Sequence, residues 1–250
     1  MIRLKNKEQI DGIRKSCALL SEFLERLRPM VQPGVSLLEL DKFAYDYTIK
    51  RGGKPAFLDY EGYPASICLS VNETVIHGIP SKRRLVEGDI IGADYGIELD
   101  GYFSDSAVTW AVGKVGSEAD QLMRVTRECL DKAIEAVVPG ARVHDIARAV
   151  FSHATRYGYG VVRQYCGHGV GLEMHEDPQI PNYISSGPNP RLLPGMVIAI
   201  EPMINAGKGD VKELADDWTV VTLDGSLSAH YEHTVLVTES GHEVLTSWTF

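Results

Sequence analysis

An internal repeat constrains the fold of this 250-residue chain more than any other feature. Each copy contains an apolar helix, a Pro-Gly break, a second helix, a glycine stop and then strand-like segments. A shift of 106 residues pairs Val31 with Val137, Pro33 with Pro139, Gly34 with Gly140, Glu39 with Asp145, Leu40 with Ile146 and Gly52 with Gly158. A Pro-Gly break between helices is common, so coincidence is the alternative. Six matches in one register favour a duplication, with a site where the strands of the two halves meet.

Apolar periodicity predicts four helices. The first contains the stripe Ile10 to Leu27, which ends at Pro29, and the second starts at Ser36, with Glu39 completing a capping box. The third and fourth helices are expected at 117–138 and 143–157. Strand-like segments are predicted at 66–71, 90–94, 107–112, 161–162, 196–204, 218–223 and 230–237, with a Pro/Gly-rich loop at 178–194. We therefore expect a single α+β domain over residues 1–250, with helices covering one face of a curved antiparallel sheet.

Composition restricts the class of protein. The chain is 44% hydrophobic and carries a formal net charge of −9, which argues against non-specific nucleic-acid binding. Its four cysteines form no close pair in the sequence, which favours a reducing compartment over a disulfide framework. The sequence shows neither a membrane-spanning apolar run nor a signal-peptide core. These features predict a cytoplasmic protein.

Four carboxylates lie at the end of, or within, strand-like segments. Asp94 ends one apolar run, Asp105 ends a Gly-Tyr-Phe-Ser-Asp segment, and Glu201 and Glu232 interrupt two more; His168 lies between two glycines. Buried carboxylates are costly unless their charge is compensated. If the four meet at one point, either protons or metal ions must neutralise them. Two divalent cations would match the four negative charges.

The five candidate ligands are mainly oxygen donors with one nitrogen, a set that suits Mn, Fe(II), Co or Zn. Five protein ligands are too many for one catalytic metal with an open position, so we expect two metals that share a nucleophilic water. His77 and His175 are not needed as ligands. Both could therefore donate hydrogen bonds to a tetrahedral intermediate or to a leaving nitrogen.

The chain resembles the type I methionine aminopeptidases, which belong to the M24-type metallopeptidases. The resemblance lies in the segments NETVIHGIP (72–80), GDIIGAD (88–94), DGYFSD (100–105), YCGHGVG (165–171), HEDP (175–178), IEPM (200–203) and YEHT (231–234). These segments cover nearly the whole chain in the family's order and spacing. The chain departs from the commoner pattern at Ile76, Tyr95 and Met174, which leaves metal preference and details of specificity open.

The resemblance implies a pita-bread fold with two related halves, and removal of an initiator methionine that precedes a small residue. It implies that Asp94 binds one metal, that Asp105 and Glu232 bridge both, and that His168 and Glu201 complete the second. Glu201 would also be the general base, His175 would stabilise the oxyanion, and His77 would contact the peptide nitrogen. The residues that match a methionine side-chain pocket are Tyr60, Tyr63, Cys68 and Trp218.

The resemblance also implies nascent polypeptide N-termini as partners of a monomeric enzyme, with no membrane or specific nucleic-acid partner. The sequence shows neither the zinc-binding N-terminal extension of some type I forms nor the large insertion of type II. Basic residues at Arg3, Lys5 and Lys7 and at 82–84 are interpreted as solvated surface, with ribosome contact as an open hypothesis.

Each of these features also has an ordinary structural interpretation. Taken singly, Asp94 and Asp105 could be strand-end or turn residues, and His168 could lie in a flexible loop. His230, His233 and His242 are interpreted as ordinary polar residues. A proline-specific peptidase of the same fold is the enzymatic rival, and a non-catalytic binding protein that kept the fold is the rival from another class.

Overall fold

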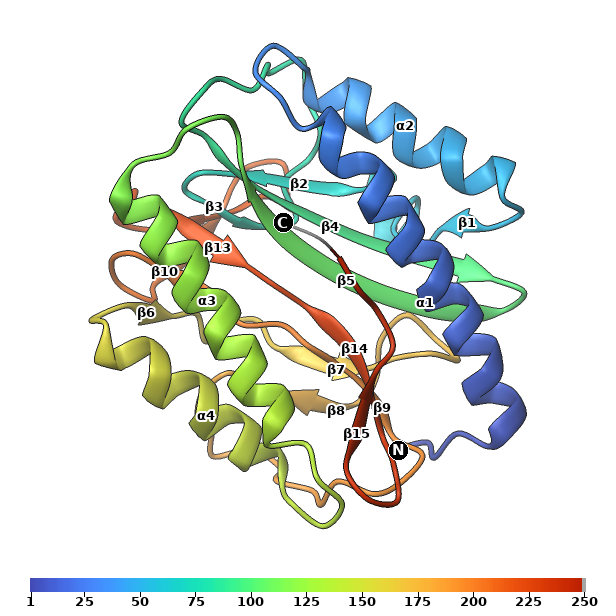
Figure 1. Ribbon diagram of the computed structural model, residues 1–250. Coiled ribbons are helices and arrows are strands. Elements are labelled where there is room, and N and C mark those ends of the chain that lie inside the picture. The colour runs from blue at the N-terminus through green and yellow to red at the C-terminus, as the bar shows by residue number, and fades with distance from the viewer. Residues whose placement is uncertain (249–250) are drawn as a thin grey trace.

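Helix α1 (Lys7–Leu27) follows the predicted apolar stripe. Asn6 caps its N-terminus, and the Asn6 side chain accepts a hydrogen bond from the backbone nitrogen of Gln9 at 2.9 Å. The stripe buries Ile13, Leu20 and Leu24 completely. In this computed structural model, which describes residues 1–248, α1 crosses the strands of one half of the molecule (Figure 1).

The second helix, α2 (Leu37–Lys50), opens with the predicted capping box. The hydroxyl of Ser36 accepts from the Glu39 backbone nitrogen at 3.3 Å, and the Glu39 carboxylate accepts from the Ser36 backbone nitrogen at 2.8 Å. Helices α3 (Ser117–Glu135) and α4 (Val143–Arg156) form the second pair. The predicted end of α3 at residue 138 is wrong, because the chain leaves the helix before Pro139, and a residue that precedes proline avoids helical geometry.

The turn before α2 has a counterpart before α4. Gly34 and Gly140 adopt φ values of 93° and 85°, and their backbone nitrogens donate to the carbonyl oxygens of Leu85 and Leu192 at 2.7 and 2.8 Å. The guanidinium groups of Arg84 and Arg191 donate to the carbonyl oxygens of the same two glycines. Both helices have 14 residues. The two turns therefore repeat the same contacts, as the predicted duplication requires.

Over residues 1–248, the strands pair antiparallel and form four small sheets, with strand orders β1-β4-β2 (β5 also paired with β4), β13-β10-β6, β11-β12-β3 and β15-β14-β9-β7-β8. Their bounds are β1 Lys54–Pro55, β2 Cys68–Val71, β3 Thr74–Ile76, β4 Ile90–Leu99, β5 Tyr102–Ala111, β6 Gly160–Val161, β7 Gly167–Gly169, β8 Glu176–Ile180, β9 Val197–Ile200, β10 Met203–Asn205, β11 Val211–Glu213, β12 Val220–Thr222, β13 Ser228–His230, β14 His233–Val237 and β15 His242–Val244. Two short 3₁₀ turns lie at Arg28–Met30 and Tyr60–Gly62. The α+β class with antiparallel strands and covering helices is confirmed.

Two predicted strands are divided where a glutamate occurs. Segment 196–204 splits into β9 and β10 around Glu201 and Pro202, and segment 230–237 splits between β13 and β14 at Tyr231 and Glu232. Proline has no backbone N–H for a ladder, so the break after Glu201 has a local cause. The strands predicted at 90–94 and 107–112 are longer than expected, since β4 and β5 have ten residues each and pair along their whole length.

The two halves of the molecule are joined through β5 and β14. The Glu232 backbone nitrogen donates to the Ala107 carbonyl oxygen at 2.8 Å, and the Thr234 hydroxyl donates to the Asp105 carbonyl oxygen at 2.7 Å. Helices α1 and α2 lie with the first half and α3 and α4 with the second (Figure 1). One large apolar core, which includes Phe23 of α1, Trp110 of β5 and Leu122 of α3, runs beneath both pairs. Among the described residues, none of the helices is both long and apolar enough to span a membrane.

Candidate metal centre and active site

The β4–β5 hairpin places Asp94 and Asp105 on the same face. Asp94 pairs with Ala107, and Asp105 pairs with Gly96. Residues two apart on a strand share a face, so the two aspartates are diagonal neighbours across the hairpin. Their separation of 11 residues in the sequence follows from this register.

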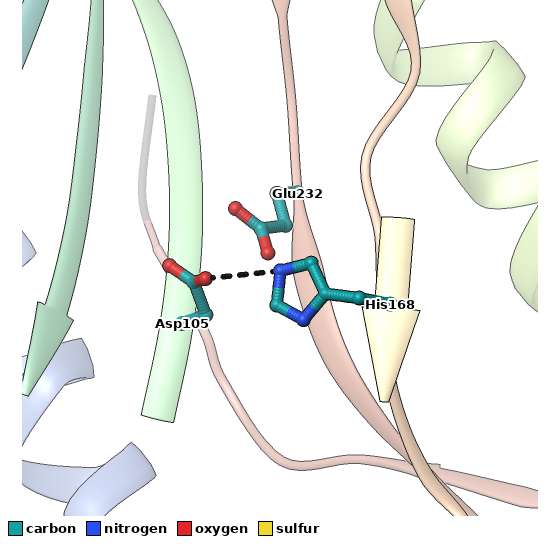
Figure 2. A group of neighbouring side chains, drawn as sticks. All are labelled: Asp105, His168 and Glu232. Carbon is teal, nitrogen blue, oxygen red and sulfur yellow. Dashed lines mark ion pairs between the residues drawn. The ribbon is translucent and has the colours of Figure 1, made fainter. Parts of the chain in front are cut away.

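The second half contributes the imidazole and two glutamates. His168 lies in β7, Glu201 directly follows β9, and Glu232 lies between β13 and β14. The Nε2 atom of His168 is 3.5 Å from Oδ2 of Asp105 and 3.6 Å from Oε1 of Glu201. Figure 2 shows Asp105, His168 and Glu232 pointing toward one another, and each offers one ligand atom within 4.8 Å of the others.

A backbone contact fixes the tautomer of His168. Its Nδ1 lies 2.9 Å from the carbonyl oxygen of Gly169. A carbonyl oxygen can only accept, so Nδ1 carries the proton and Nε2 presents a lone pair to the carboxylates. This is the arrangement of a histidine that ligates a metal through Nε2.

The charge balance of the cluster calls for cations. Burial raises the pKa of Asp105 well above its ordinary value, and burial together with repulsion from Asp105 does the same for Asp94, Glu201 and Glu232. Burial lowers the pKa of His168 to about 4, so this imidazole is neutral near pH 7. Within residues 1–248, the buried atoms Oδ1 of Asp94, Oδ1 of Asp105 and Oε1 of Glu232 find no hydrogen-bond partner. Unsatisfied buried oxygens and a neutral imidazole fit divalent cations.

All of the predicted site residues line one cavity of about 350 Å³. The structure thus brings together the five candidate ligands and the residues with other predicted roles: Tyr60, Tyr63, Cys68, His77, Asp94, Asp105, His168, His175, Glu201, Trp218 and Glu232. Their shared location is a finding, whereas their individual roles stay predictions.

His77 and His175 lie beside the cluster. The ring of His175 is 4.2 Å from that of His168, and its Nδ1 is 2.8 Å from the hydroxyl of Tyr60. His77 adopts a left-handed backbone with φ of 56°, and its ring lies 6.0 Å from the ring of Trp218. Burial lowers the pKa of both histidines to about 4. Near neutral pH, each can therefore act as a neutral hydrogen-bond donor.

An apolar recess adjoins the carboxylates. The rings of Tyr63 and Trp218 meet edge to face at 5.1 Å, and Cys68 packs with them. Cys68 pairs with Asp94 across β2 and β4, which places the recess next to the Asp94 carboxylate. The recess therefore offers apolar contacts directly beside the cluster.

Three residues near the cavity were not predicted from the sequence. Phe57 and Glu61 line it, and the buried His230 has its Nε2 at 3.7 Å from Oε2 of Glu201. Treating His230 as an ordinary polar residue left out this contact. Its position two residues before Glu232 was a usable signal, since alternate residues of an extended segment share a face.

Comparison with known proteins agrees with this geometry. Residues 11–239 match metallopeptidase family M24. The methionine aminopeptidase of Treponema pallidum is 52% identical over 250 residues, which cover all of this chain and 98% of that protein. The crystal structure of methionine aminopeptidase from Rickettsia prowazekii matches with a TM-score of 0.96 at 39% identity, over 99% of this chain and 100% of that one. This match confirms the pita-bread fold expected from the sequence.

A more distant solved structure is the prolidase from Pyrococcus furiosus. It matches with a TM-score of 0.81 at 27% identity, over 99% of this chain but only 66% of the prolidase. Full-length similarity thus lies with the methionine aminopeptidases, and the family match spans most of the sequence. The chain belongs to metallopeptidase family M24.

Proposed function

We propose that this chain is a methionine aminopeptidase, a hydrolase that removes the initiator methionine from nascent proteins and peptides when the second residue is small. One observation carries the proposal: the five candidate ligands and the apolar recess of Tyr63, Cys68 and Trp218 line the same cavity. A side chain held in the recess would bring the adjoining peptide bond to the carboxylates. The similarity to full-length methionine aminopeptidases supports the same substrate.

We infer that Asp94, Asp105, His168, Glu201 and Glu232 hold two divalent cations, drawn from Mn, Fe(II), Co or Zn. When bound, the cations would supply Lewis-acid activation of the scissile carbonyl and of the attacking water. They would also satisfy the buried oxygens of Asp94, Asp105 and Glu232 that lack partners among residues 1–248.

In the proposed mechanism, the residues around the cluster move and hold protons. Glu201 accepts a proton from the attacking water and returns it to the leaving nitrogen. His175 donates to the oxygen that becomes negative, with its ring held by the contact with the Tyr60 hydroxyl. His77, against Trp218, contacts the peptide nitrogen and donates to it once it becomes the leaving nitrogen. Tyr60, Tyr63, Cys68 and Trp218 enclose the methionine side chain.

The remaining expectations belong to the same proposal. Residues 1–250 form one catalytic domain that acts as a monomer on nascent N-termini in the cytoplasm, and the size limit at the second residue is steric. Contact with the ribosome through the basic residues at Arg3, Lys5 and Lys7 and at 82–84 is a further expectation. Lys5 is in fact buried, with its side chain 1% exposed, which removes it from any such surface.

The direct test is mass spectrometry of a peptide panel after incubation with metal-loaded protein. The panel contains peptides that start Met-Ala, Met-Leu, Leu-Ala and Ala-Pro, each with Mn, Co, Fe(II) or Zn. We expect loss of methionine from the Met-Ala peptide alone, and no loss with Glu201→Gln as the matched control. Cleavage of Ala-Pro instead would assign the chain to proline-specific peptidases, and no cleavage with any metal would favour a binding protein.

A further inference from the structure

A buried ion pair joins the first residues of the chain to the loop that carries His175. The ammonium of Lys5 lies 2.9 Å from Oε2 of Glu176, and the two side chains are only 1% and 2% exposed. The neighbouring pair of Arg3 and Glu173 is different, because its side chains are 47% and 57% exposed. Surface pairs contribute little, whereas a buried pair that loses one partner leaves an uncompensated charge.

The second carboxylate oxygen of Glu176 binds two backbone nitrogens of the loop at residues 171–176. Oε1 of Glu176 accepts from the backbone nitrogens of Leu172 and Glu173 at 2.7 and 3.2 Å. Lys5 is itself fixed, because its backbone nitrogen donates to the Gly195 carbonyl oxygen at 2.8 Å. One carboxylate therefore holds both the loop and the segment that precedes α1.

The loop also has fixed contacts on its remaining sides. The carbonyl oxygen of Gly171 accepts from the Phe103 backbone nitrogen at 2.8 Å, which ties the loop to the strand of Asp105. A Cβ at Gly171 would lie 2.4 Å from Cδ1 of Ile13, so the loop lies directly against α1. The loop has little room to shift while these contacts hold.

His175 is the residue that this arrangement places. It immediately precedes Glu176, the first residue of β8. Glu176 points to Lys5, while His175 lines the cavity and contacts Tyr60 and His168. The pair is electrically neutral as a whole, so it adds no net charge beside the carboxylates.

We propose that Lys5 is a positioning residue for the reaction: through Glu176 it holds the 171–176 loop, and so His175, in the geometry that catalysis needs. The catalytic consequence rests on the proposed aminopeptidase function. The structural consequence does not, because the loop contacts exist without substrate. Lys5 contacts no group assigned to bind substrate or metal.

The first experiment compares Lys5→Met with Lys5→Arg in the full chain. Lys5→Met keeps the length of the stem and removes the charge, and we expect kcat on a Met-Ala peptide to fall about 10- to 100-fold with KM changed less than about 3-fold. Lys5→Arg should retain most of the activity. Arg14→Met is the matched control, because it breaks a remote ion pair between α1 and Glu243 and should leave both constants unchanged.

A double-mutant cycle tests whether the effect passes through His175. In a His175→Ala background, adding Lys5→Met should lower kcat by less than about 3-fold, because the group that it positions is gone. An equal fall in both backgrounds would overturn the proposal. If Lys5→Met does not fold, the double variant Lys5→Met/Glu176→Gln takes its place. It removes both buried charges and keeps an acceptor for the backbone nitrogens of Leu172 and Glu173, and it is tested in the same cycle.

Hydrogen exchange separates this proposal from the proposed function. In the metal-free protein, the amides of Leu172 and Glu173 should exchange at least 10-fold faster in Lys5→Met than in the unchanged chain or Lys5→Arg. Unchanged protection of these amides would overturn the positioning role, whatever the activity. If the unchanged chain cleaves no methionyl peptide while Lys5→Met still exchanges faster, the loop contact is upheld and the aminopeptidase function is rejected instead.

Discussion

Glu201 has surroundings that suit proton transfer. Its carboxylate faces two imidazoles, with Nε2 of His168 at 3.6 Å and Nε2 of His230 at 3.7 Å. Its backbone carbonyl accepts from the side chain of Asn182 at 3.0 Å, which holds the break between β9 and β10. Burial, followed by repulsion from Asp105 and Asp94, raises the pKa of Glu201 well above its ordinary value.

Glu201→Gln should abolish most turnover and leave the fold intact. Glutamine has the same shape but cannot accept the proton, so we expect kcat on a Met-Ala peptide to fall about 10²- to 10⁴-fold. The melting temperature should stay close to that of the unchanged protein, measured by circular dichroism. Glu213→Gln, in exposed β11, is the control. Near-normal activity would contradict the assignment of Glu201.

His77 should affect catalysis far more than stability. His77→Ala removes the ring against Trp218, and His77→Asn removes it while tolerating the left-handed backbone at this position. Both changes should lower kcat about 10²-fold, with little change in melting temperature for the asparagine variant. The exposed His242 provides the control as His242→Asn. Parallel losses of activity and stability in His77→Asn would show a structural histidine.

At the scale of single elements, strand β7 is built around two glycines that flank His168. A Cβ at Gly167 would lie 2.3 Å from the Ala199 carbonyl oxygen, so only glycine permits this approach of β7 to β9. The strand is only three residues long, and the position of the imidazole depends on it directly.

Gly167→Ala should therefore weaken both the fold and metal binding. We expect a loss of about 1–3 kcal/mol in the free energy of unfolding, as in other overpacked sites, measured with urea. Calorimetric titration with Mn²⁺ should show weaker binding by the folded variant. Gly241→Ala is the matched control, because a Cβ there meets nothing within 4 Å and the backbone is not left-handed. Unchanged Mn²⁺ affinity in Gly167→Ala would contradict the dependence on β7.

The elements that sequence analysis predicted well are those fixed by neighbouring residues. The capping box of Ser36 and Glu39 and the apolar stripe of α1 are local patterns, and the structure confirms both. The break at Glu232 depends on strand pairing between distant segments, because its backbone nitrogen bonds to Ala107 of β5. The contact of His230 with Glu201 has the same origin. The site residues could be named from the sequence, but their geometry could not.

At the scale of the whole molecule, the duplication places one carboxylate of each half at the same point. Strand β4 begins at Ile90 and β9 at Val197, a shift of 107 residues, and the same shift relates Asp94 to Glu201. The hydroxyl of Ser106 donates to the Glu232 carbonyl oxygen at 2.8 Å, which joins the halves beside the cluster. The centre therefore forms only when both halves are folded together, and metal binding should stabilise the whole molecule.

In the metal-free protein, the carboxyl groups and the histidines of the site change the stability in opposite directions as the pH rises. The pKa values of the four carboxyl groups are raised in the folded protein, so their protonation favours the folded state. This contribution to stability is complete below their pKa in the unfolded chain, near 4, and is lost as the pH rises through their pKa values in the folded protein. The pKa values of His77, His168 and His175 are lowered by burial to about 4. Their contribution is present above about 6.5 and is lost as pH falls toward 4.

Divalent cations should thus stabilise the protein more at pH 7.5 than at pH 5. The histidines, with pKa values of about 4, are mainly neutral at both pH values. The carboxyl groups hold fewer protons at the higher pH, so the cation displaces fewer protons from its ligands and cancels more of their repulsion. We expect the rise in melting temperature on replacing EDTA with Mn²⁺ to grow steadily between pH 5 and 7.5, measured by scanning fluorimetry. Asp105→Asn, which removes the carboxylate nearest to His168, should show a smaller rise at every pH. An equal rise at pH 5 and 7.5 would mean that Mn²⁺ binds elsewhere.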